Sequence, residues 1–231
     1  MTVVVQQIVY TSAPERWWAL AVALGFFPAY EPSVEWGEFE ADGILAVHHA
    51  IDAHPAGACD LHLLVDDLDG AAEALSAFTV SRALMDGVGE VLTVRPASGL
   101  SITVSEGARP LPGGDISVQP IWFQRDVGEA RTILEALGLR PSISAEAGGW
   151  VELTAAGGTV GVHEGEPRIG LSFVATGDLD ALATRLTDAG FTASVVDEAY
   201  ARTVRIVDPD GGDEIWVNGT QDDLYGYRRE S

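Results

Sequence analysis

The feature that most constrains the fold of this chain is an internal duplication. Residues 6–28 align without a gap on residues 119–141, an offset of 113 positions, and six residues are identical in the two copies. Further matches follow in order at offsets of 111 to 115, including Trp36-x-Glu38 with Trp150-x-Glu152 and His48 with His163. One matching pair would be noise, but a series at a nearly fixed offset indicates that an ancestral unit was doubled.

Each half divides again into two smaller units with the same pattern of elements. Residues 6–11 alternate in hydrophobicity like a strand, and Ser12 is placed to cap the helix that follows. Gly25 stands where a helix commonly ends on a left-handed residue. Two strand-like runs come next, separated by a glycine-containing turn. We interpret each unit as strand–helix–strand–strand–strand.

The second unit of each half repeats this pattern. Strand-like runs at 60–65 and 170–176 precede Asp67 and Asp178, which we expect to be helix N-caps. Two further strands complete each unit. A unit of about 55 to 60 residues cannot bury a curved sheet by itself, so we expect the units to pair.

Composition excludes several classes of function. The formal net charge is −22, from 13 basic and 35 acidic side chains, which disfavours binding to a nucleic-acid backbone. All the basic residues are arginine, so the chain has no lysine for a Schiff base or a P-loop. No apolar run is long enough to span a bilayer, and the N-terminus lacks the pattern of a signal peptide, so we expect a cytoplasmic protein without a membrane partner. A single cysteine, Cys59, cannot form an intramolecular disulfide.

Local motifs resemble those of a known superfamily. Leu24-Gly25-Phe26 is similar to its helix-ending LGF, residues 65–69 to its VDDLD helix start, and residues 208–211 with 214–217 to its DPDG turn and last strand. On these motifs the chain is identified as a tandem member of the vicinal oxygen chelate superfamily (glyoxalase, bleomycin-resistance and extradiol dioxygenase-like proteins). The resemblance implies an α+β fold of four βαβββ modules that form two domains, each an open, cup-shaped, eight-stranded sheet. The expected domains are residues 1–112, with modules of about 1–57 and 58–112, and residues 113–231, with modules of about 113–167 and 168–231.

The resemblance also implies where a metal would lie. Metal-dependent members hold a divalent ion at the floor of the cup with His, Gln or Glu from first and last strands of the modules. The matching positions of this chain are Gln6, Ala46, Asp60 and Thr103 in the first half, and Gln119, Gly161, Leu171 and Trp216 in the second. Because few of these side chains can ligate, the expected cofactor is none.

An alternative site with one divalent metal ion is open in the first half. His48 lies two residues beyond Ala46 and hence on the same strand face, so Gln6, His48 and Asp60 are the candidate ligands, with His62 on the face of Asp60. In the competing interpretation, His48 and His163 are equivalent structural residues at a strand edge that bond to the backbone or to water.

Two tryptophan–glutamate pairs are candidates for a ligand-binding wall. Trp36 and Glu38, like Trp150 and Glu152, lie two residues apart and share a strand face, which suits a flat or cationic ligand. The equally weighted alternative packs the tryptophans under the helices and leaves the glutamates in solvent. The complete set of predicted ligand-binding residues is Trp36, Glu38, His48, Trp122, Trp150, Glu152, His163, Tyr200 and Trp216.

These observations lead to two hypotheses. The first is a metal-independent protein that binds or sequesters a small aromatic or cationic molecule, with a small-molecule ligand as its partner. The alternative is a divalent-metal-dependent lyase, isomerase or dioxygenase with a nonstandard site in the first half. Four modules can close two cups within one chain, so either a monomer or a homodimer is expected.

Overall fold

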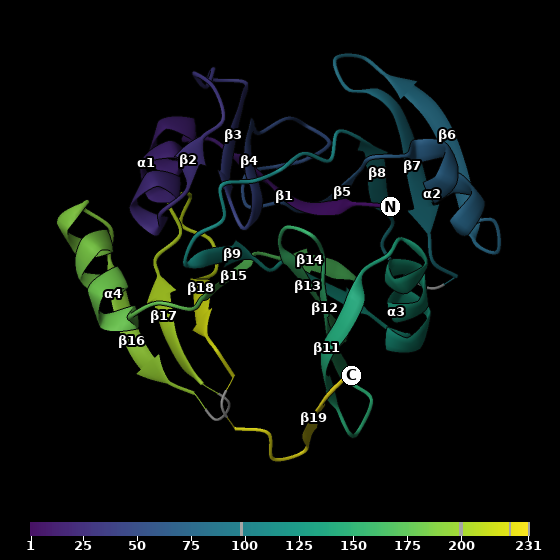
Figure 1. Ribbon diagram of the computed structural model, residues 1–231. Helices are drawn as coiled ribbons and strands as arrows, with labels where there is room; N and C mark the ends of the chain where they lie inside the picture. Colours follow the sequence, from purple (N-terminus) through teal and green to yellow (C-terminus); the bar gives the residue numbers. More distant parts are fainter. Residues whose placement is uncertain (98, 199–200, 222, 231) are drawn as a thin grey trace.

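The computed structural model describes residues 1–97, 99–198, 201–221 and 223–230. In this part of the chain no helix is long and apolar enough to cross a membrane. The first half contains two strand–helix–strand units joined in one sheet (Figure 1). Its elements are β1 (Val3–Thr11), α1 (Pro14–Leu24), β2 (Phe27–Pro28), β3 (Trp36–Ala41), β4 (Gly43–His49), β5 (Cys59–Val65), α2 (Leu68–Ala74), β6 (Thr79–Met85), β7 (Gly89–Arg95) and β8 (Ile102–Glu106).

The eight strands of the first half form one sheet in the order β2-β3-β4-β1-β5-β8-β7-β6. β1 runs parallel to β4 and antiparallel to β5, so that Gln6 lies opposite both Ile44 and His62. Val3, Val5 and Val9 belong to the main core with the helices, whereas Val4 belongs to a separate small cluster. Alternate side chains of β1 therefore point to the helix-covered convex face and to the concave face.

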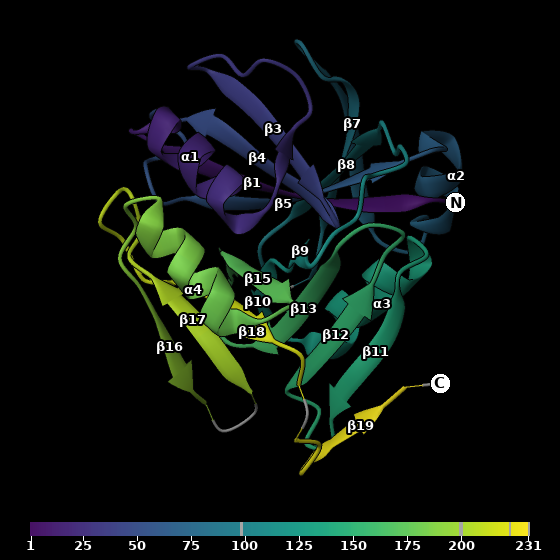
Figure 2. The ribbon, with the colours of Figure 1, turned by 60° about the vertical axis from the view of Figure 1, so that its left-hand side comes forward.

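The second half repeats this topology with a broken centre. Its elements are β9 (Ile116–Val118), β10 (Ile121–Gln124), α3 (Val127–Ala136), β11 (Arg140–Ala145), β12 (Trp150–Thr154), β13 (Thr159–Glu164), β14 (Arg168–Gly170), β15 (Ser172–Ala175), α4 (Leu179–Asp188), β16 (Ala193–Asp197), β17 (Arg202–Ile206), β18 (Ile215–Gly219) and β19 (Tyr227–Arg229). The sheets are β14-β10-β13-β12-β11-β19 and β16-β17-β18-β15-β9. Read together, they give the strand order of the first half with β19 added at one edge (Figure 2).

The break differs from the expected single eight-stranded sheet and has a cause in the sequence. The strand that corresponds to β1 is interrupted at Pro120, which has no backbone N–H to donate to a ladder. β9 pairs with β15 before this point, and β10 pairs with β13 and β14 after it. The second cup is thus built from two sheets, where the first is built from one continuous sheet.

The predicted helix ends are confirmed with one exception. The carboxylates of Asp67 and Asp178 accept hydrogen bonds from backbone N–H groups of the first turns of α2 and α4. Gly25 ends α1 in the left-handed conformation, with φ of 109°. Ser12 is not the N-cap of α1: this position is taken by Ala13, which makes no side-chain cap.

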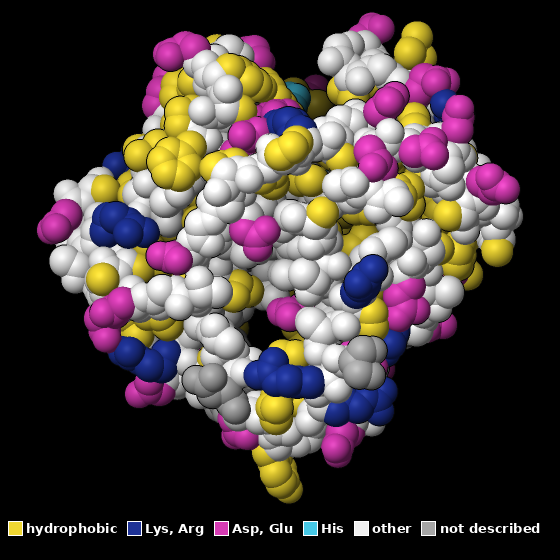
Figure 3. Space-filling model, in the orientation of Figure 1, with side chains coloured by type: hydrophobic (Ala, Val, Ile, Leu, Met, Phe, Trp, Pro, Cys, Tyr) yellow, Lys and Arg dark blue, Asp and Glu magenta, His cyan; other side chains and the backbone are white. Residues whose placement is uncertain are grey.

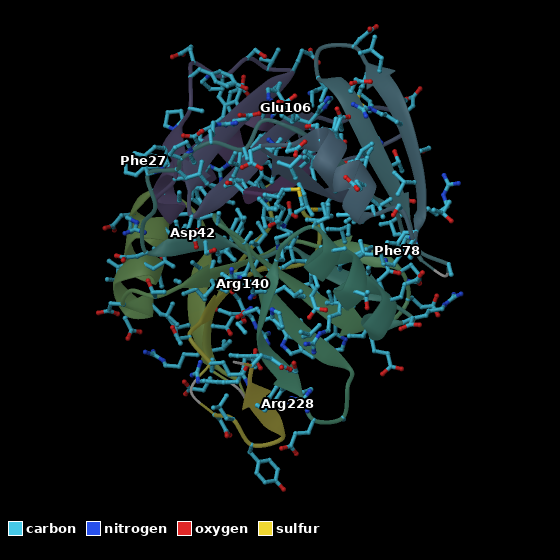
Figure 4. The ribbon with its side chains drawn as sticks, turned by 45° about the vertical axis from the view of Figure 1, so that its right-hand side comes forward. Phe27, Asp42, Phe78, Glu106, Arg140 and Arg228 are labelled. Atoms are coloured by element: carbon cyan, nitrogen blue, oxygen red, sulfur yellow. The ribbon has the colours of Figure 1, made fainter. Side chains whose placement is uncertain are left out.

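Several contacts fix the two halves against each other. Arg185 of α4 donates to the carbonyl oxygens of Ala23 and Leu24 at the end of α1. Asp42, labelled in Figure 4 at the junction of the halves, accepts a hydrogen bond from the backbone N–H of Gly158 at 2.9 Å. The helices cover the outer faces of the sheets, and the concave faces remain for other contacts (Figure 1).

Candidate functional site

A cavity of about 980 Å³ lies in the second cup. Figure 3 shows the surface hollowed at this place, between the positions of β18 and β13 in Figure 1. The cavity also reaches Val9, Gly57 and Cys59 of the first half, so both halves contribute to its wall. Burial raises the pKa of the Cys59 thiol to about 12, so this thiol stays protonated at neutral pH and is no ready nucleophile.

A glutamine–glutamate pair lines one part of the cavity. The Nε2 group of Gln119 donates to Oε2 of Glu152 at 2.5 Å, and the hydroxyl of Ser142 donates to Oε1 at 2.6 Å. Gln119 is buried, whereas Glu152 is partly exposed. Both residues and Ser142 line the cavity, so the carboxylate is held in a fixed orientation beside it.

An aromatic row crosses the same wall. Four residues on neighbouring strands are paired in register, one after the next. They are Trp150 of β12, His163 of β13, Phe123 of β10 and Arg168 of β14. Paired residues of neighbouring strands project to the same face. The ring centroid of His163 lies 5.8 Å from that of Trp150 and 5.4 Å from that of Phe123. The Arg168 guanidinium lies 3.7 Å from the ring centroid of Phe123. The row gives the cavity a broad apolar surface with a cation at its end.

Gly161 makes room for the indole of this row. A methyl group built on Gly161 would lie 2.3 Å from Cη2 of Trp150 and 2.7 Å from Cδ1 of Ile121. The indole therefore lies over the backbone at Gly161, at the position where the superfamily resemblance implies a metal ligand. The missing donor is replaced by an aromatic surface.

The opposite wall is polar and carries a second tryptophan. Asn218 of β18 donates to the hydroxyl of Ser172 on β15 at 3.3 Å and accepts from Thr203. Trp216 is 36% exposed, lines the cavity and lies under the guanidinium of Arg205, 5.0 Å from the ring centroid.

The first cup contains the same two arrangements at equivalent positions. The Nε2 group of Gln6 donates to Oε1 of Glu38 at 3.2 Å. The ring centroid of His48 lies 5.6 Å from that of Trp36 and 5.1 Å from that of Tyr10. Duplication has therefore preserved both a glutamine–glutamate pair and a tryptophan–histidine–aromatic row.

In the first cup, however, the chain itself covers the pair. The linker between β8 and β9 crosses the concave face (Figure 1), with Ala108 and Leu111 packed on the small apolar cluster that contains Val4. Arg109 donates from Nη2 to Glu38 at 2.6 Å and from Nε to Glu40 at 2.7 Å. We call residues 107–114 the strap. The strap binds the carboxylate of Glu38, whereas the equivalent Glu152 of the second cup faces the cavity.

His62 is a buried polar group of the first cup. Its Nδ1 lies 2.7 Å from the Thr103 hydroxyl and its Nε2 lies 2.8 Å from the Ser105 hydroxyl. Burial lowers the pKa of His62 to about 4. The imidazole is therefore neutral at physiological pH, and both ring nitrogens are already engaged.

The alternative metal ligands of the first half are not brought together. Gln6 and His48 are separated by four register positions along β1 and β4, which is about 13 Å. Asp60 accepts from the Tyr10 hydroxyl at 2.9 Å and lies 3.5 Å from Nδ1 of His54. Among the described residues, no group of three or more His, Cys, Asp or Glu side chains is placed to hold a metal ion. The predicted set does not fit a metal.

The remaining predicted site residues separate into three groups. Trp150, Glu152, His163 and Trp216 line the cavity of the second cup. Trp36, Glu38 and His48 form the equivalent group of the first cup. The assignment of Trp122 to ligand binding is wrong, because its side chain is fully buried in the main core and donates to the carbonyl of Leu100. Tyr200 lies outside the described residues.

Sequence reasoning missed several residues of the site. Phe123 aligns with Tyr10 at the offset of the duplication and shares a strand face with Ile121, two residues earlier. The repeat could therefore have identified Phe123 as a site residue. Arg109 stands in a linker without periodicity, and Ser142 reaches Glu152 from a neighbouring strand. No local signal predicts either contact.

Comparisons with known proteins identify the fold. No protein-family model matches the sequence, and no curated protein does. Among solved structures, the chain is similar to the 2,3-dioxygenase LapB from Pseudomonas sp. KL28, with 13% identity, a TM-score of 0.62, and coverage of 96% of this chain and 92% of that chain. It is similar to homoprotocatechuate 2,3-dioxygenase from Brevibacterium fuscum, with 14% identity, a TM-score of 0.59, and coverage of 94% and 70%. It is also similar to 4-hydroxymandelate synthase from Streptomyces coelicolor, with 15% identity, a TM-score of 0.55, and coverage of 96% and 93%.

These similarities confirm the fold expected from the sequence. The chain has the fold of the vicinal oxygen chelate superfamily, in its tandem form. At 13–15% identity the likeness concerns the fold alone. The neighbours are dioxygenases and a synthase by name, and these activities are those of the neighbours.

Proposed function

We propose that the second cup is the binding site of this protein and that it takes a small molecule with a flat aromatic body. The observation that carries this proposal is the difference between the cups. The second has an open cavity of about 980 Å³ beside Glu152, whereas the equivalent Glu38 is covered by the strap. This volume lies at the upper end of the range for small-molecule sites, roughly 300–1,000 Å³.

The lining supports a flat ligand. Trp150 and Phe123 present aromatic surface on one wall and Trp216 on the other. An aromatic ligand gains both apolar burial and ring–ring contacts at such a surface, worth about 0.5–1.5 kcal/mol for each well-oriented pair. Gln119 and Asn218 also line the cavity and add polar surface to its walls.

Calorimetric titration with indole, a neutral flat probe, tests this proposal. We expect one binding site per chain, weakened at least tenfold by Trp150→Ala. Trp36→Ala removes the equivalent residue of the first cup and is the matched control, which should leave the affinity unchanged. Failure to bind indole or any other aromatic probe, or equal loss in the two variants, would contradict the proposal.

A second candidate is catalysis of the dioxygenase type, supported by the names of the structural neighbours. The donor set of the second cup fits this poorly. Gln119, Glu152, Ser172 and Asn218 offer one carboxylate with neutral oxygens, whereas non-haem iron oxygenases commonly use two imidazoles and a carboxylate. We therefore assign no reaction step to these residues.

Metal analysis separates the two candidates. Protein purified without chelator would be analysed for iron, manganese, nickel and zinc, and dioxygen uptake would be followed with homoprotocatechuate. Stoichiometric metal together with dioxygen consumption would establish the enzyme. Indole binding by metal-free protein, without dioxygen uptake by protein loaded with iron, would establish the binding function alone.

A further inference from the structure

The two equivalent glutamates of the cups have different partners. Glu38 accepts from Gln6 and from the guanidinium of Arg109. Glu152 accepts from Gln119 and from the hydroxyl of Ser142, and in the described part of the chain no arginine forms an ion pair with it. The first carboxylate is neutralised within the chain, whereas the second faces a cavity with its charge uncompensated.

We infer that the ligand of the second cup carries a cationic nitrogen group, an amidinium, guanidinium or ammonium, that binds Glu152 as Arg109 binds Glu38. This inference rests on the proposed function, because it names the chemical class of the molecule that the second cup takes. In the first cup, the Arg109 side chain occupies the place that we assign to the ligand in the second. Its planar guanidinium binds the carboxylate of Glu38, and Leu111 packs on the apolar cluster nearby.

The position of Glu152 fixes where the cation sits relative to the ring. Trp150 and Glu152 are two residues apart on β12 and project to the same face, about 7 Å apart. A cationic group attached directly to an aromatic ring can therefore reach the carboxylate while the ring contacts the indole. Gln119 and Ser142 hold the carboxylate in place, which reduces the cost of ordering it on binding.

The charges elsewhere in the cavity are compatible with a cationic ligand. Asp208, Asp213 and Glu214 also line the cavity. Asp208 is buried, whereas Asp213 and Glu214 are exposed and Glu214 pairs with Arg205, so the buried Asp208 adds most to the negative potential. The lining arginines Arg168 and Arg229 are both exposed, so solvent screens them. Arg229 is on the outermost strand, opposite Ile143, which is itself opposite Glu152. The backbones at Arg229 and Glu152 are therefore about 10 Å apart, and no ion pair joins the two side chains.

Three probes of the same shape and different charge test the inference. Benzamidine, benzamide and benzoate would be titrated calorimetrically against the full-length protein. We expect benzamidine to bind at least tenfold more tightly than benzamide, and benzoate to bind most weakly. Glu152→Gln should remove the preference while benzamide still binds. The control Glu73→Gln changes an exposed glutamate on α2 of the first half, outside the cavity lining, and should keep the preference.

The outcomes distinguish this inference from the proposed function. If benzamide or benzoate binds as tightly as benzamidine, the inference is wrong although the aromatic site stands. If none of the three binds, the proposed function fails with it. If the preference for benzamidine survives in Glu152→Gln, another acid selects the cation and the inference is overturned.

The first cup provides an independent arm of the test. Arg109→Ala combined with Leu111→Ala removes the two side chains by which the strap holds the first cup. We expect the benzamidine stoichiometry to rise from one to two in this variant, and to return to one when Glu38→Gln is added. Circular dichroism would verify that the variants are folded. If the folded Arg109→Ala, Leu111→Ala variant still binds only one benzamidine, the two glutamates are not equivalent.

Discussion

Arg109 bridges two carboxylates of the first cup, donating from Nη2 to Glu38 and from Nε to Glu40. Both glutamates lie on β3 and project to the concave face, where they would repel each other without a cation. The guanidinium comes from the strap, so the segment that joins the duplicated halves also neutralises the first cup. In the second half, the described residues that follow β18 border the cavity, where Thr220, Gln221 and Tyr227 line it, and lead into β19 at the edge of the sheet. None of these residues forms an ion pair with Glu152.

Replacing Arg109 should destabilise the protein. Glu38 and Glu40 are 16% and 18% exposed, so Arg109→Ala leaves two partly desolvated charges unpaired. Arg109 itself is 35% exposed and solvent screens the pair, which limits the expected loss to about 1–2 kcal/mol. Urea denaturation would measure the free energy of unfolding.

The control for this prediction is Arg95→Ala, which removes an exposed arginine without an ion pair in the described residues. Its unfolding free energy should stay within about 0.5 kcal/mol of the parent. Adding Glu38→Gln and Glu40→Gln to Arg109→Ala should recover part of the loss. No recovery would show that the strap is held by its apolar contacts instead.

His62 should make the protein less stable in mild acid. Its folded-state pKa is lowered to about 4 by burial, against an ordinary value near 6.5. Between these values the unfolded chain binds a proton that the folded protein does not, so the free energy of unfolding falls as the pH drops from 6.5 towards 4. The shift corresponds to a loss of about 2–3 kcal/mol.

The measurement is a series of urea denaturations from pH 7 to pH 4. Many carboxylates also titrate near the lower end, so the comparison is with His62→Gln, which keeps a donor and an acceptor for Thr103 and Ser105. The parent should lose more stability than the variant over this interval, mainly between pH 6.5 and 5. Parallel curves for the two proteins would refute the assignment to His62.

Gly161→Ala should disturb the aromatic wall of the second cup. The added methyl group would meet Trp150 and Ile121 at distances that require one of them to move. The indole lies at the cavity and is the freer of the two, so we expect a changed tryptophan emission and loss of indole binding, with about 1–2 kcal/mol of destabilisation. Gly161→Ala with Trp150→Leu should regain the stability without regaining the binding.

Much of the fold could be predicted from the sequence because the relevant signals are local or repeated. The duplication places Glu38 and Glu152 at equivalent positions, and strand alternation puts each on the face of its tryptophan neighbour. Asp67 and Asp178 act as caps through backbone groups within one turn. Such features depend on spacing along the chain, which the sequence displays directly.

The parts that could not be predicted depend on contacts between distant residues. Trp122 is an exception: it aligns with the core residue Val9 and lies on the strand face opposite Ile121 and Phe123, so alternation alone places its indole in the core, where the carbonyl of Leu100 accepts its N–H. Gln6, His48 and Asp60 share a face in the sequence pattern, but register spreads them along the strands. Which cup is open depends on the path of the strap, and a linker without periodicity carries no signal for that path.

The DPDG turn of the last module should prove important for joining the halves. Oδ2 of Asp210 accepts from the indole N–H of Trp17 at 2.8 Å, and Oδ1 accepts from both the backbone N–H and the hydroxyl of Ser12. These bonds hold the pKa of Asp210 below its usual range although desolvation acts to raise it. Trp17 is fully buried, so Asp210→Ala leaves its N–H unsatisfied and should cost about 2–3 kcal/mol of unfolding free energy.

Asp52→Ala, an exposed aspartate without a partner among the described side chains, is the control for Asp210→Ala and should be nearly neutral. Since Asp210 and Trp17 belong to different halves, the unfolding of Asp210→Ala should also lose cooperativity, so that tryptophan fluorescence and the far-ultraviolet signal no longer change together. Trp17→Phe removes the indole donor, so a double-mutant cycle with Asp210→Ala isolates the contribution of this bond. A coupling energy near zero would mean that this hydrogen bond does not help to hold the halves together.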